Sequence, residues 1–198
     1  MLGAYGGHPG TVVLGLPRGG VPVAAEVARS LGAPLDVFVV RKLGVPGREE
    51  LAMGAMATGG VLVRNEDVVA HLGVSEEEFS AVAAREAGEL QRRELAYRAG
   101  RPALEVSGRR VILVDDGLAT GSTMRAAVAA LRQRDPREVV VAVPTAPIDR
   151  LVALRSEADT VLSARTPEPF TAVSESYLDF SQTSDDEVRH LLLDPQRG

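Results

Sequence analysis

The sequence predicts an α/β protein built on a doubly wound, mainly parallel sheet of about five strands. The prediction depends on five short valine-rich runs, which are residues 11–17, 35–42, 111–116, 138–146 and 159–165. Each run is apolar throughout instead of alternating, which is typical of strands covered by helices on both faces. Helical patterns lie between the runs, and strands that alternate with helices indicate a parallel sheet.

Two helices are expected directly after the first and third runs. Apolar residues recur at spacings of three and four over residues 23–31, with Pro22 near the start and Gly32 as the expected end. The same spacing recurs over residues 124–131. Both helices therefore open at the carboxyl end of a predicted strand.

The segment between the second and third runs departs from this rhythm. Ser75 and Glu78 have the spacing of a capping box, and the apolar residues that follow lie along one side of a helix. We interpret residues 66–100 as a helical insertion, a hairpin over one edge of the sheet, that ends at Gly100-Arg101-Pro102. The alternative is that these helices are ordinary crossover helices of the main core.

Composition indicates a single ordinary globular domain over residues 1–198. The chain is 45% apolar and 25% charged, and no uninterrupted apolar run approaches the ~18 residues of a membrane span. It has no cysteine and its first ten residues do not resemble a secretory signal, so we expect a cytoplasmic protein. The net charge of −5 argues against a nucleic-acid partner and favours small molecules.

The third run continues into the acidic motif VILVDDGLATGST, Val111 to Thr123. Ligands of open α/β sheets bind beyond the carboxyl ends of strands, where Asp115 and Asp116 are expected. The following residues form a short loop rich in glycines and hydroxyl groups, which are Gly117, Ala119, Thr120, Gly121, Ser122 and Thr123 among others. Exposed amides and a helix N-terminus make this loop, residues 117–123, a candidate phosphate site.

A ribose 5-phosphate satisfies both halves of the acidic motif. Its phosphate fits the loop, and its two secondary hydroxyls can donate to the carboxylates of Asp115 and Asp116. Hydrogen bonds to charged acceptors contribute about 1.5–3 kcal/mol each. The motif is neither a Walker A loop, which needs a lysine, nor a GxGxxG fingerprint.

Four aliphatic residues, two acids, three variable residues, Thr, Gly, any residue and Thr resemble the signature of type I phosphoribosyltransferases. That resemblance implies binding of 5-phosphoribosyl-1-pyrophosphate at residues 111–123. The competing interpretation is a receiver domain, whose acidic pair also ends a strand. A receiver needs a phosphorylatable aspartate at the end of a later strand, and Asp149 and Asp159 do not occupy such a place.

The glycine loop, residues 15–20 (GLPRGG), ends the first strand and resembles the pyrophosphate-binding loop of the same family. The resemblance implies that Arg18, Gly19 and Gly20 bind the pyrophosphate leaving group. In the family this loop often contains a strained or cis peptide bond. An arginine fork suits phosphate oxygens. The alternative is a plain strand-to-helix turn with an arginine in solvent.

Further basic residues are candidates for binding the pyrophosphate. Arg41 and Lys42, the only lysine, close the second run at a place where adenine and orotate phosphoribosyltransferases carry a similar pair; the alternative is a basic strand end in solvent. Residues 43–60 occupy the place of the family's mobile lid. The insertion carries Arg92, Arg93, Arg98 and Arg101. These arginines either face the anionic ligand or lie on a solvent-exposed helix face, where neighbours such as Glu89 and Glu94 stabilise them.

The C-terminal residues 166–198 resemble the variable hood that holds the acceptor in these enzymes. Phe170 is the candidate for stacking on the acceptor, against the alternative of ordinary core packing. Residues 184–187 (SDDE) are expected to cap a short final helix. Residues 50–55, the insertion and residues 177–188 together look most like a bacterial branch of phosphoribosyltransferases with a helical insertion.

The resemblance implies a magnesium-dependent transferase of nucleotide metabolism, with the metal held mainly through the substrate and also by Asp115 or Asp116. The expected partners are 5-phosphoribosyl-1-pyrophosphate and a small-molecule acceptor, with a homodimer left open. Asp115, Asp116, Arg41 and Lys42 are the catalytic candidates. The alternative is a non-catalytic protein that senses ribose phosphates or nucleotides. Relatives in this branch carry an amphipathic helix before the first strand, which this chain lacks, so it is open whether the chain is part of a longer protein.

Overall fold

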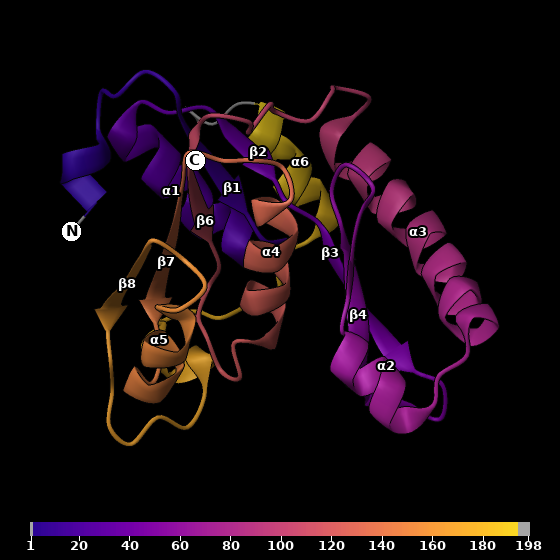
Figure 1. Ribbon diagram of the computed structural model, residues 1–198. Helices are drawn as coiled ribbons and strands as arrows, with labels where there is room; N and C mark the ends of the chain where they lie inside the picture. Colours follow the sequence, from indigo (N-terminus) through magenta and orange to yellow (C-terminus); the bar gives the residue numbers. More distant parts are fainter. Residues whose placement is uncertain (1, 194–198) are drawn as a thin grey trace.

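A five-stranded parallel sheet forms the centre of the protein (Figure 1). The computed structural model describes residues 2–193. The strands are β1 (Thr11–Gly15), β2 (Leu35–Val37), β6 (Arg110–Val114), β7 (Glu138–Thr145) and β8 (Thr160–Arg165), and their order is β2-β1-β6-β7-β8. Every neighbouring pair is parallel. The predicted fold class is therefore confirmed.

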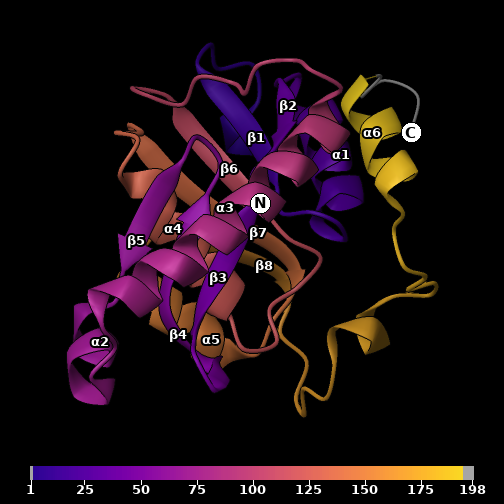
Figure 2. The same ribbon diagram turned by 90° about the vertical axis from the view of Figure 1, so that its right-hand side faces the viewer.

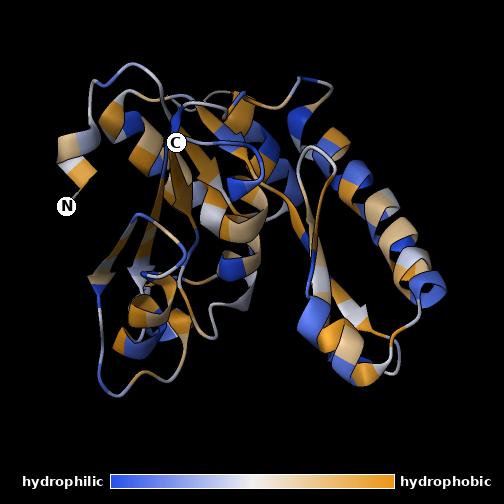
Figure 3. Cartoon of the chain, in the orientation of Figure 1, coloured by the Kyte–Doolittle hydropathy of each residue, from blue (hydrophilic) through white to orange (hydrophobic). Residues whose placement is uncertain are grey.

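Helices cover both faces of this sheet (Figure 2). On one face, Val13 and Ile112 pack in a buried cluster with α1 (Gly20–Leu31) and α6 (Asp185–Leu193). On the other face, Val12 and Leu113 pack with α4 (Ser122–Arg132) and α5 (Ile148–Leu154). Because successive strand residues point to opposite faces, strands that serve two cores are apolar throughout. Figure 3 shows hydrophobic residues concentrated on these strands.

The predicted strand at residues 35–42 is two strands in different sheets. β2 ends at Val37, and β3 (Val40–Val45) begins a separate antiparallel sheet with β4 (Arg48–Ala57) and β5 (Val61–Arg64), in the order β3-β4-β5. The chain bends at Phe38 and Val39, where the Val39 amide donates to the Thr58 hydroxyl (2.8 Å). An unbroken apolar run conceals such a bend, because β2 is buried and β3 is largely buried or half-buried.

Two helices follow the small sheet, α2 (Glu66–Leu72) and α3 (Glu76–Arg98). The predicted capping box is present: the Ser75 hydroxyl accepts from the Glu78 amide (3.2 Å), and the Glu78 carboxylate accepts from the Ser75 amide (2.9 Å). α3 packs on β3, β4 and α6. The helices thus occupy the predicted insertion, and α3 lies mainly on the small sheet.

A buried ion pair fixes the C-terminal end of α3 to the edge strand β2. The Arg98 guanidinium donates to the Asp36 carboxylate (2.9 Å) and to the Val37 carbonyl (2.8 Å), and it also contacts Glu94. The side chains of Arg98 and Asp36 are 6% and 7% exposed. Since a buried charge without a partner is costly, this pair determines where the helix ends on the sheet.

The chain ends flank the main sheet. A single 3-10 turn, η1 (Leu2–Tyr5), precedes β1, while η2 (Val173–Ser176) and α6 lie in the C-terminal segment. Figure 2 shows this segment running along one side of the molecule from η2 to α6. Between residues 2 and 193, no helix has both the length and the apolar character needed to cross a bilayer.

Candidate active site

The acidic pair lies directly beyond the carboxyl end of the central strand β6. Val114 is the last residue of the strand, and Asp115 and Asp116 follow it half-buried. The Asp115 carboxylate accepts a hydrogen bond from the Asp116 amide (2.9 Å). This is the position that the sequence predicts for the pair, at the edge of the sheet where α/β proteins bind ligands.

Burial perturbs the titration of both acids. Burial first, and then the charge of Asp116, raise the pKa of Asp115 to about 8. Burial also raises the pKa of Asp116, opposed by hydrogen bonds from its own amide and that of Gly117. Two adjacent carboxyl groups in a desolvated place do not ionise easily together. They therefore favour a ligand that brings hydroxyl donors or positive charge.

The loop 117–123 lines a hollow of about 270 Å³ between the acids and the start of α4. Gly121 has a φ of 76° and precedes the first residue of the helix, a left-handed conformation that side chains other than glycine rarely adopt. The Thr120 and Ser122 hydroxyls lie 3.1 Å apart in this loop. Hydroxyl groups and a helix N-terminus thus meet at one hollow, which suits a phosphate.

The glycine loop packs against the same acids. The peptide bond between Pro17 and Arg18 is cis, which agrees with the expectation for this loop. A Cβ atom on Gly19 would lie 2.0 Å from the Asp116 Oδ2 atom, and one on Gly20 would lie 2.8 Å from the Asp115 Cα atom. Both positions therefore need glycine for β6 and the loop to approach so closely.

The two basic residues of β3 point in opposite directions, as neighbours on a strand do. The Arg41 guanidinium turns toward α3, where it donates to the Glu86 carboxylate (2.6 Å). Although burial opposes ionisation of Glu86, hydrogen bonds from Arg41 and Arg85 hold its pKa below the ordinary value. Lys42 instead lines a hollow of about 570 Å³ that Ser122 also lines. Of the two, only Lys42 faces the start of α4.

The C-terminal segment covers the acids from the other side. The Tyr177 hydroxyl donates to the Asp116 carbonyl (2.5 Å), and burial, followed by the charges of Asp116 and Asp115, raises the Tyr177 pKa to about 12. The Phe180 ring lies 5.1 Å from the Tyr177 ring. A Cβ atom on Gly117 would lie 2.7 Å from Val173, so the segment also packs closely on the motif.

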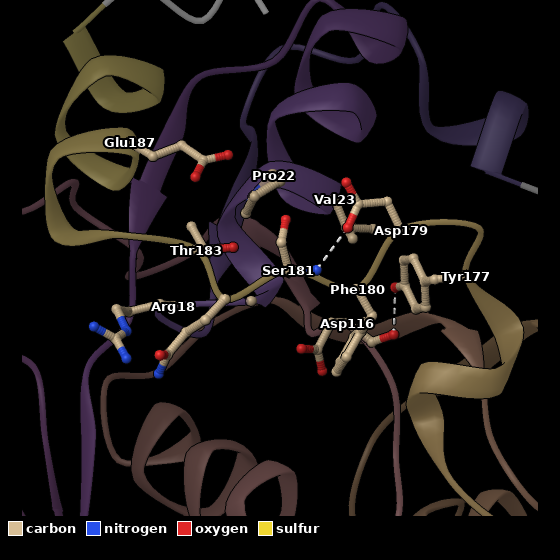
Figure 4. A pocket seen from close by; sticks show the side chains of 12 residues that line it. Arg18, Pro22, Val23, Asp116, Tyr177, Asp179, Phe180, Ser181, Thr183 and Glu187 are labelled. Carbon is tan, nitrogen blue, oxygen red and sulfur yellow. Dashed lines mark hydrogen bonds between the residues drawn. The ribbon is translucent and has the colours of Figure 1, made fainter.

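Tyr177 and Phe180 are the aromatic residues at the site, and the sequence prediction names a different one. Phe170 is not among the residues lining the cavities beside the acids, whereas Tyr177 and Phe180 line a cavity of about 490 Å³ (Figure 4). Both stand in the stretch 177–182 (YLDFSQ), which combines aromatic and polar residues. This mixture of aromatic and polar residues, in a stretch without helix or strand periodicity, is the sequence feature that could have indicated the cavity lining.

Two cavities meet at the acidic pair. Asp116 and Phe180 line both the hollow at the loop 117–123 and the larger cavity under the C-terminal segment. Arg18 and Gly19 belong to the wall of the larger one. A ligand with a phosphate at one end and a second group at the other can therefore occupy both cavities with its middle at Asp116.

Comparison with known proteins agrees with this arrangement. Residues 3–179 match the profile of the phosphoribosyl transferase domain. The chain belongs to the phosphoribosyl transferase family. The predicted resemblance is thus confirmed.

Similar proteins occur in Mycobacterium tuberculosis and in Thermus thermophilus. Each of two Mycobacterium tuberculosis strains, CDC 1551 / Oshkosh and H37Rv, has a protein named "Putative phosphoribosyl transferase" that is 51% identical over 177 residues, or 89% of this chain. The chain spans 40% of the length of those relatives. The crystal structure of TT1426 from Thermus thermophilus has 45% identity and a TM-score of 0.86, over 95% of this chain and 89% of that one.

The arginines of the insertion have partners within the protein. Arg92 and Arg93 donate to Glu89, whose pKa their hydrogen bonds lower to about 2. Arg98 is buried on Asp36, and Arg101 donates to the Leu192 carbonyl (2.9 Å). For this phosphoribosyl transferase domain, the contacts favour the interpretation of a helix face stabilised by its neighbours.

The residues at the site fit a metal ion only when a ligand completes its coordination. Within residues 2–193, no three His, Cys, Asp or Glu side chains are grouped so as to hold a metal. Asp115 and Asp116 alone provide two carboxylates at the hollow. Magnesium is commonly held by one or two carboxylates together with substrate phosphates, and this donor set is compatible with that arrangement.

Proposed function

We propose that this chain transfers the 5-phosphoribosyl group of 5-phosphoribosyl-1-pyrophosphate to a nitrogen nucleophile and releases pyrophosphate. The observation that supports this most is the position of Asp116, which lies between a hollow suited to phosphate and a larger cavity that Arg18 borders. A sugar phosphate with a reactive carbon at its far end matches that order of subsites.

The substrate is held by groups from three segments. Amides and hydroxyls of the loop 117–123 bind the 5-phosphate, and Asp115 and Asp116 accept hydrogen bonds from the ribose hydroxyls. Arg18 and the backbone of the glycine loop bind the pyrophosphate. Lys42 adds positive charge from the side of α4, while Arg41 acts through Glu86 to position β3.

Magnesium is part of the proposal. Asp115 and Asp116 would hold it together with oxygen atoms of the substrate, and the chemistry that a bound magnesium ion supplies is neutralisation of charge on the departing pyrophosphate.

Transfer then needs positioning and electrostatic stabilisation. The nitrogen lone pair forms a bond to C1′ while the bond from C1′ to the pyrophosphate oxygen breaks, and its electron pair leaves with the pyrophosphate. The nitrogen proton passes to one of the two carboxylates. Positive charge develops on the ribose in this step, so the neighbouring carboxylates stabilise it, and Arg18 and Lys42 stabilise the leaving anion.

The binding part of the proposal is tested with the double variant Asp115→Asn with Asp116→Asn. A positive charge nearby favours the ionised form of both carboxyl groups, so in the presence of magnesium both count as charged acceptors. Their loss, at about 1.5–3 kcal/mol each, should weaken binding of 5-phosphoribosyl-1-pyrophosphate with magnesium by at least about a hundredfold in calorimetry. Asp149→Asn, which changes an exposed carboxylate on α5, is the matched control and should bind as the unmodified protein does. Equal affinity of the double variant would contradict the site.

The catalytic part is tested by incubating the protein with the activated sugar, magnesium and a panel of purines, pyrimidines and small amines. Release of pyrophosphate that depends on one acceptor, and that the double variant abolishes, is the expected result. Tight binding of the sugar without release for any acceptor would instead support the sensor that the sequence leaves as the alternative.

A further inference from the structure

The larger cavity beside the acids has a distinctive charge. The glycine loop and the start of α1 form one wall, and residues 177–183 with the first turn of α6 form the other (Figure 4). Its volume is about 490 Å³, enough for a single planar ring with substituents. The side chains on these walls therefore determine which acceptor fits.

Three carboxylates line this cavity, from Asp116, Asp179 and Glu187. The side chains of Asp179 and Glu187 are both exposed. Figure 4 shows Asp179 and Glu187 on opposite sides of the cavity, with Asp116 below them. A molecule inside the cavity therefore meets a carboxylate on each of these sides.

Arg18 is the one cationic side chain among the residues that line the cavity within the described part of the chain. Its guanidinium is already paired with the Asp185 carboxylate (3.6 Å), which is not a lining residue. Figure 4 shows the guanidinium turned away from Asp116 and Phe180. The proposed function assigns Arg18 to the pyrophosphate, so Arg18 does not offset the negative charge that an acceptor would meet at Asp179 and Glu187.

The uncharged groups of the cavity suit a planar ring with hydrogen-bond donors. Phe180 is 45% exposed, which leaves ring surface for stacking. The Tyr177 hydroxyl is already donating to the Asp116 carbonyl, so it has no proton to offer an incoming group. The Asp179 carboxylate accepts from the Ser181 amide (2.9 Å), which holds it in place while leaving further lone pairs available.

We propose that this cavity selects an acceptor that is planar, carries no negative charge and presents N–H donors, such as an amino-substituted or amide-substituted heteroaromatic ring, and that it rejects rings bearing a carboxylate. The inference rests on the proposed function, because it assigns the side of the cavity lined by Phe180, Asp179 and Glu187 to the acceptor, while Arg18 and the glycine loop on the other wall bind the pyrophosphate. An amino group meets carboxylate acceptors at Asp179 and Glu187, whereas a carboxylate on the ring meets like charges there.

Matched pairs of compounds test the selection. Nicotinamide against nicotinate and 2-aminobenzamide against 2-aminobenzoate differ by one amide-to-carboxylate exchange, and each compound is titrated by calorimetry into the protein with and without magnesium and ribose 5-phosphate. We expect at least one uncharged member to bind, and at least about tenfold more tightly than its carboxylate. Equal or tighter binding of the carboxylates, or no binding of either uncharged member, would overturn the proposal.

Two variants assign the selection to the named residues. Asp179→Asn with Glu187→Gln should reduce the preference for the uncharged member by about tenfold or more and raise affinity for the carboxylate. Asp186→Asn removes a neighbouring exposed carboxylate that pairs with Arg189 and does not line the cavity, so its preference should not change. A preference unaltered by the double variant would contradict the assignment. Ribose 5-phosphate affinity, measured in the same samples, separates failure of this inference from failure of the proposed function.

Discussion

At the scale of single residues, Asp115 couples the stability of the fold to pH. Its pKa is raised to about 8 by burial and then by the charge of Asp116, whereas an aspartate in an unfolded chain titrates near pH 4. Between these values the folded protein binds a proton that the unfolded chain has lost. The free energy of unfolding should therefore decrease as pH rises from about 4 to about 8, and this contribution should stop changing above that range.

Asp115→Asn removes the titrating carboxyl group, so the free energy of unfolding of this variant should decrease less between about pH 4 and about pH 8. Unfolding in urea, followed by circular dichroism at several pH values from 5 to 9, measures the difference. Between pH 5 and 7 the slopes of the two proteins should differ by at most about 1.4 kcal/mol per pH unit, the value for one proton, with the variant the more stable at high pH. Parallel curves would show that Asp115 titrates normally.

Asp116→Asn serves as the companion variant. Because the charge of Asp116 contributes to the raised pKa of Asp115, its removal should move the end of the decrease to a lower pH without abolishing it. An unchanged pH profile in this variant would leave burial as the whole cause.

The motif residues were predictable from the sequence, and the aromatic residue of the cavity was not. Asp115, Asp116 and the loop 117–123 follow an apolar strand, so their spacing alone places them at one edge of the sheet. Phe170 and Phe180 both lie outside regular structure, where no periodicity indicates which way a side chain points. Packing on Tyr177 selects Phe180.

At the scale of elements, α3 contains a position that limits its stability. Gly88 is exposed inside this 23-residue helix, and a Cβ atom there would contact nothing within 4 Å. Gly88→Ala should stabilise the protein by about 1 kcal/mol, because alanine loses less backbone freedom in a helix. For a chain of this length the thermal midpoint should rise by roughly 2–4 °C in calorimetry.

The same substitution at the end of α2 should have the opposite effect. Gly73 also has open space around it, but its φ of 64° places it in the left-handed region, where it ends the helix. Gly73→Ala should therefore lower the thermal midpoint. If both variants shifted the midpoint in the same direction, backbone conformation would not be the cause.

The strands of the main sheet were predictable from their continuous apolar runs, and the helices α1, α3 and α4 from apolar patterns long enough to show a period. The small sheet was not. β4 has the sequence REELAMGAMA, in which glutamate, alanine and glycine have little preference for strands. It forms because its C-terminal half is buried between β3 and β5, and such long-range pairing leaves no local signal.

At the scale of the whole molecule, the C-terminal segment links three parts that are distant in the sequence. The Ser176 hydroxyl donates to Thr145 at the end of β7 (2.8 Å), and the Tyr97 hydroxyl of α3 donates to Asp185 at the start of α6 (3.1 Å). Val188 and Leu192 are buried in the core that α1 and α3 share. α6 is thus anchored by packing, while the stretch 173–182 is held mainly by contacts to the site.

Tyr177→Phe tests how far that stretch depends on one hydrogen bond. The change keeps the ring and removes the donor to the Asp116 carbonyl, so the free energy of unfolding should fall by about 0.5–1.5 kcal/mol. Because α6 has its own buried contacts, hydrogen exchange should accelerate over residues 173–182 and stay unchanged over residues 185–193. Tyr5→Phe, at a ring that stacks with Arg110, is the control and should alter neither segment. Faster exchange in both segments of the Tyr177 variant would mean that the stretch 173–182 and α6 open as one unit, and the hydrogen bond to Asp116 would then hold the whole C-terminal segment on the domain.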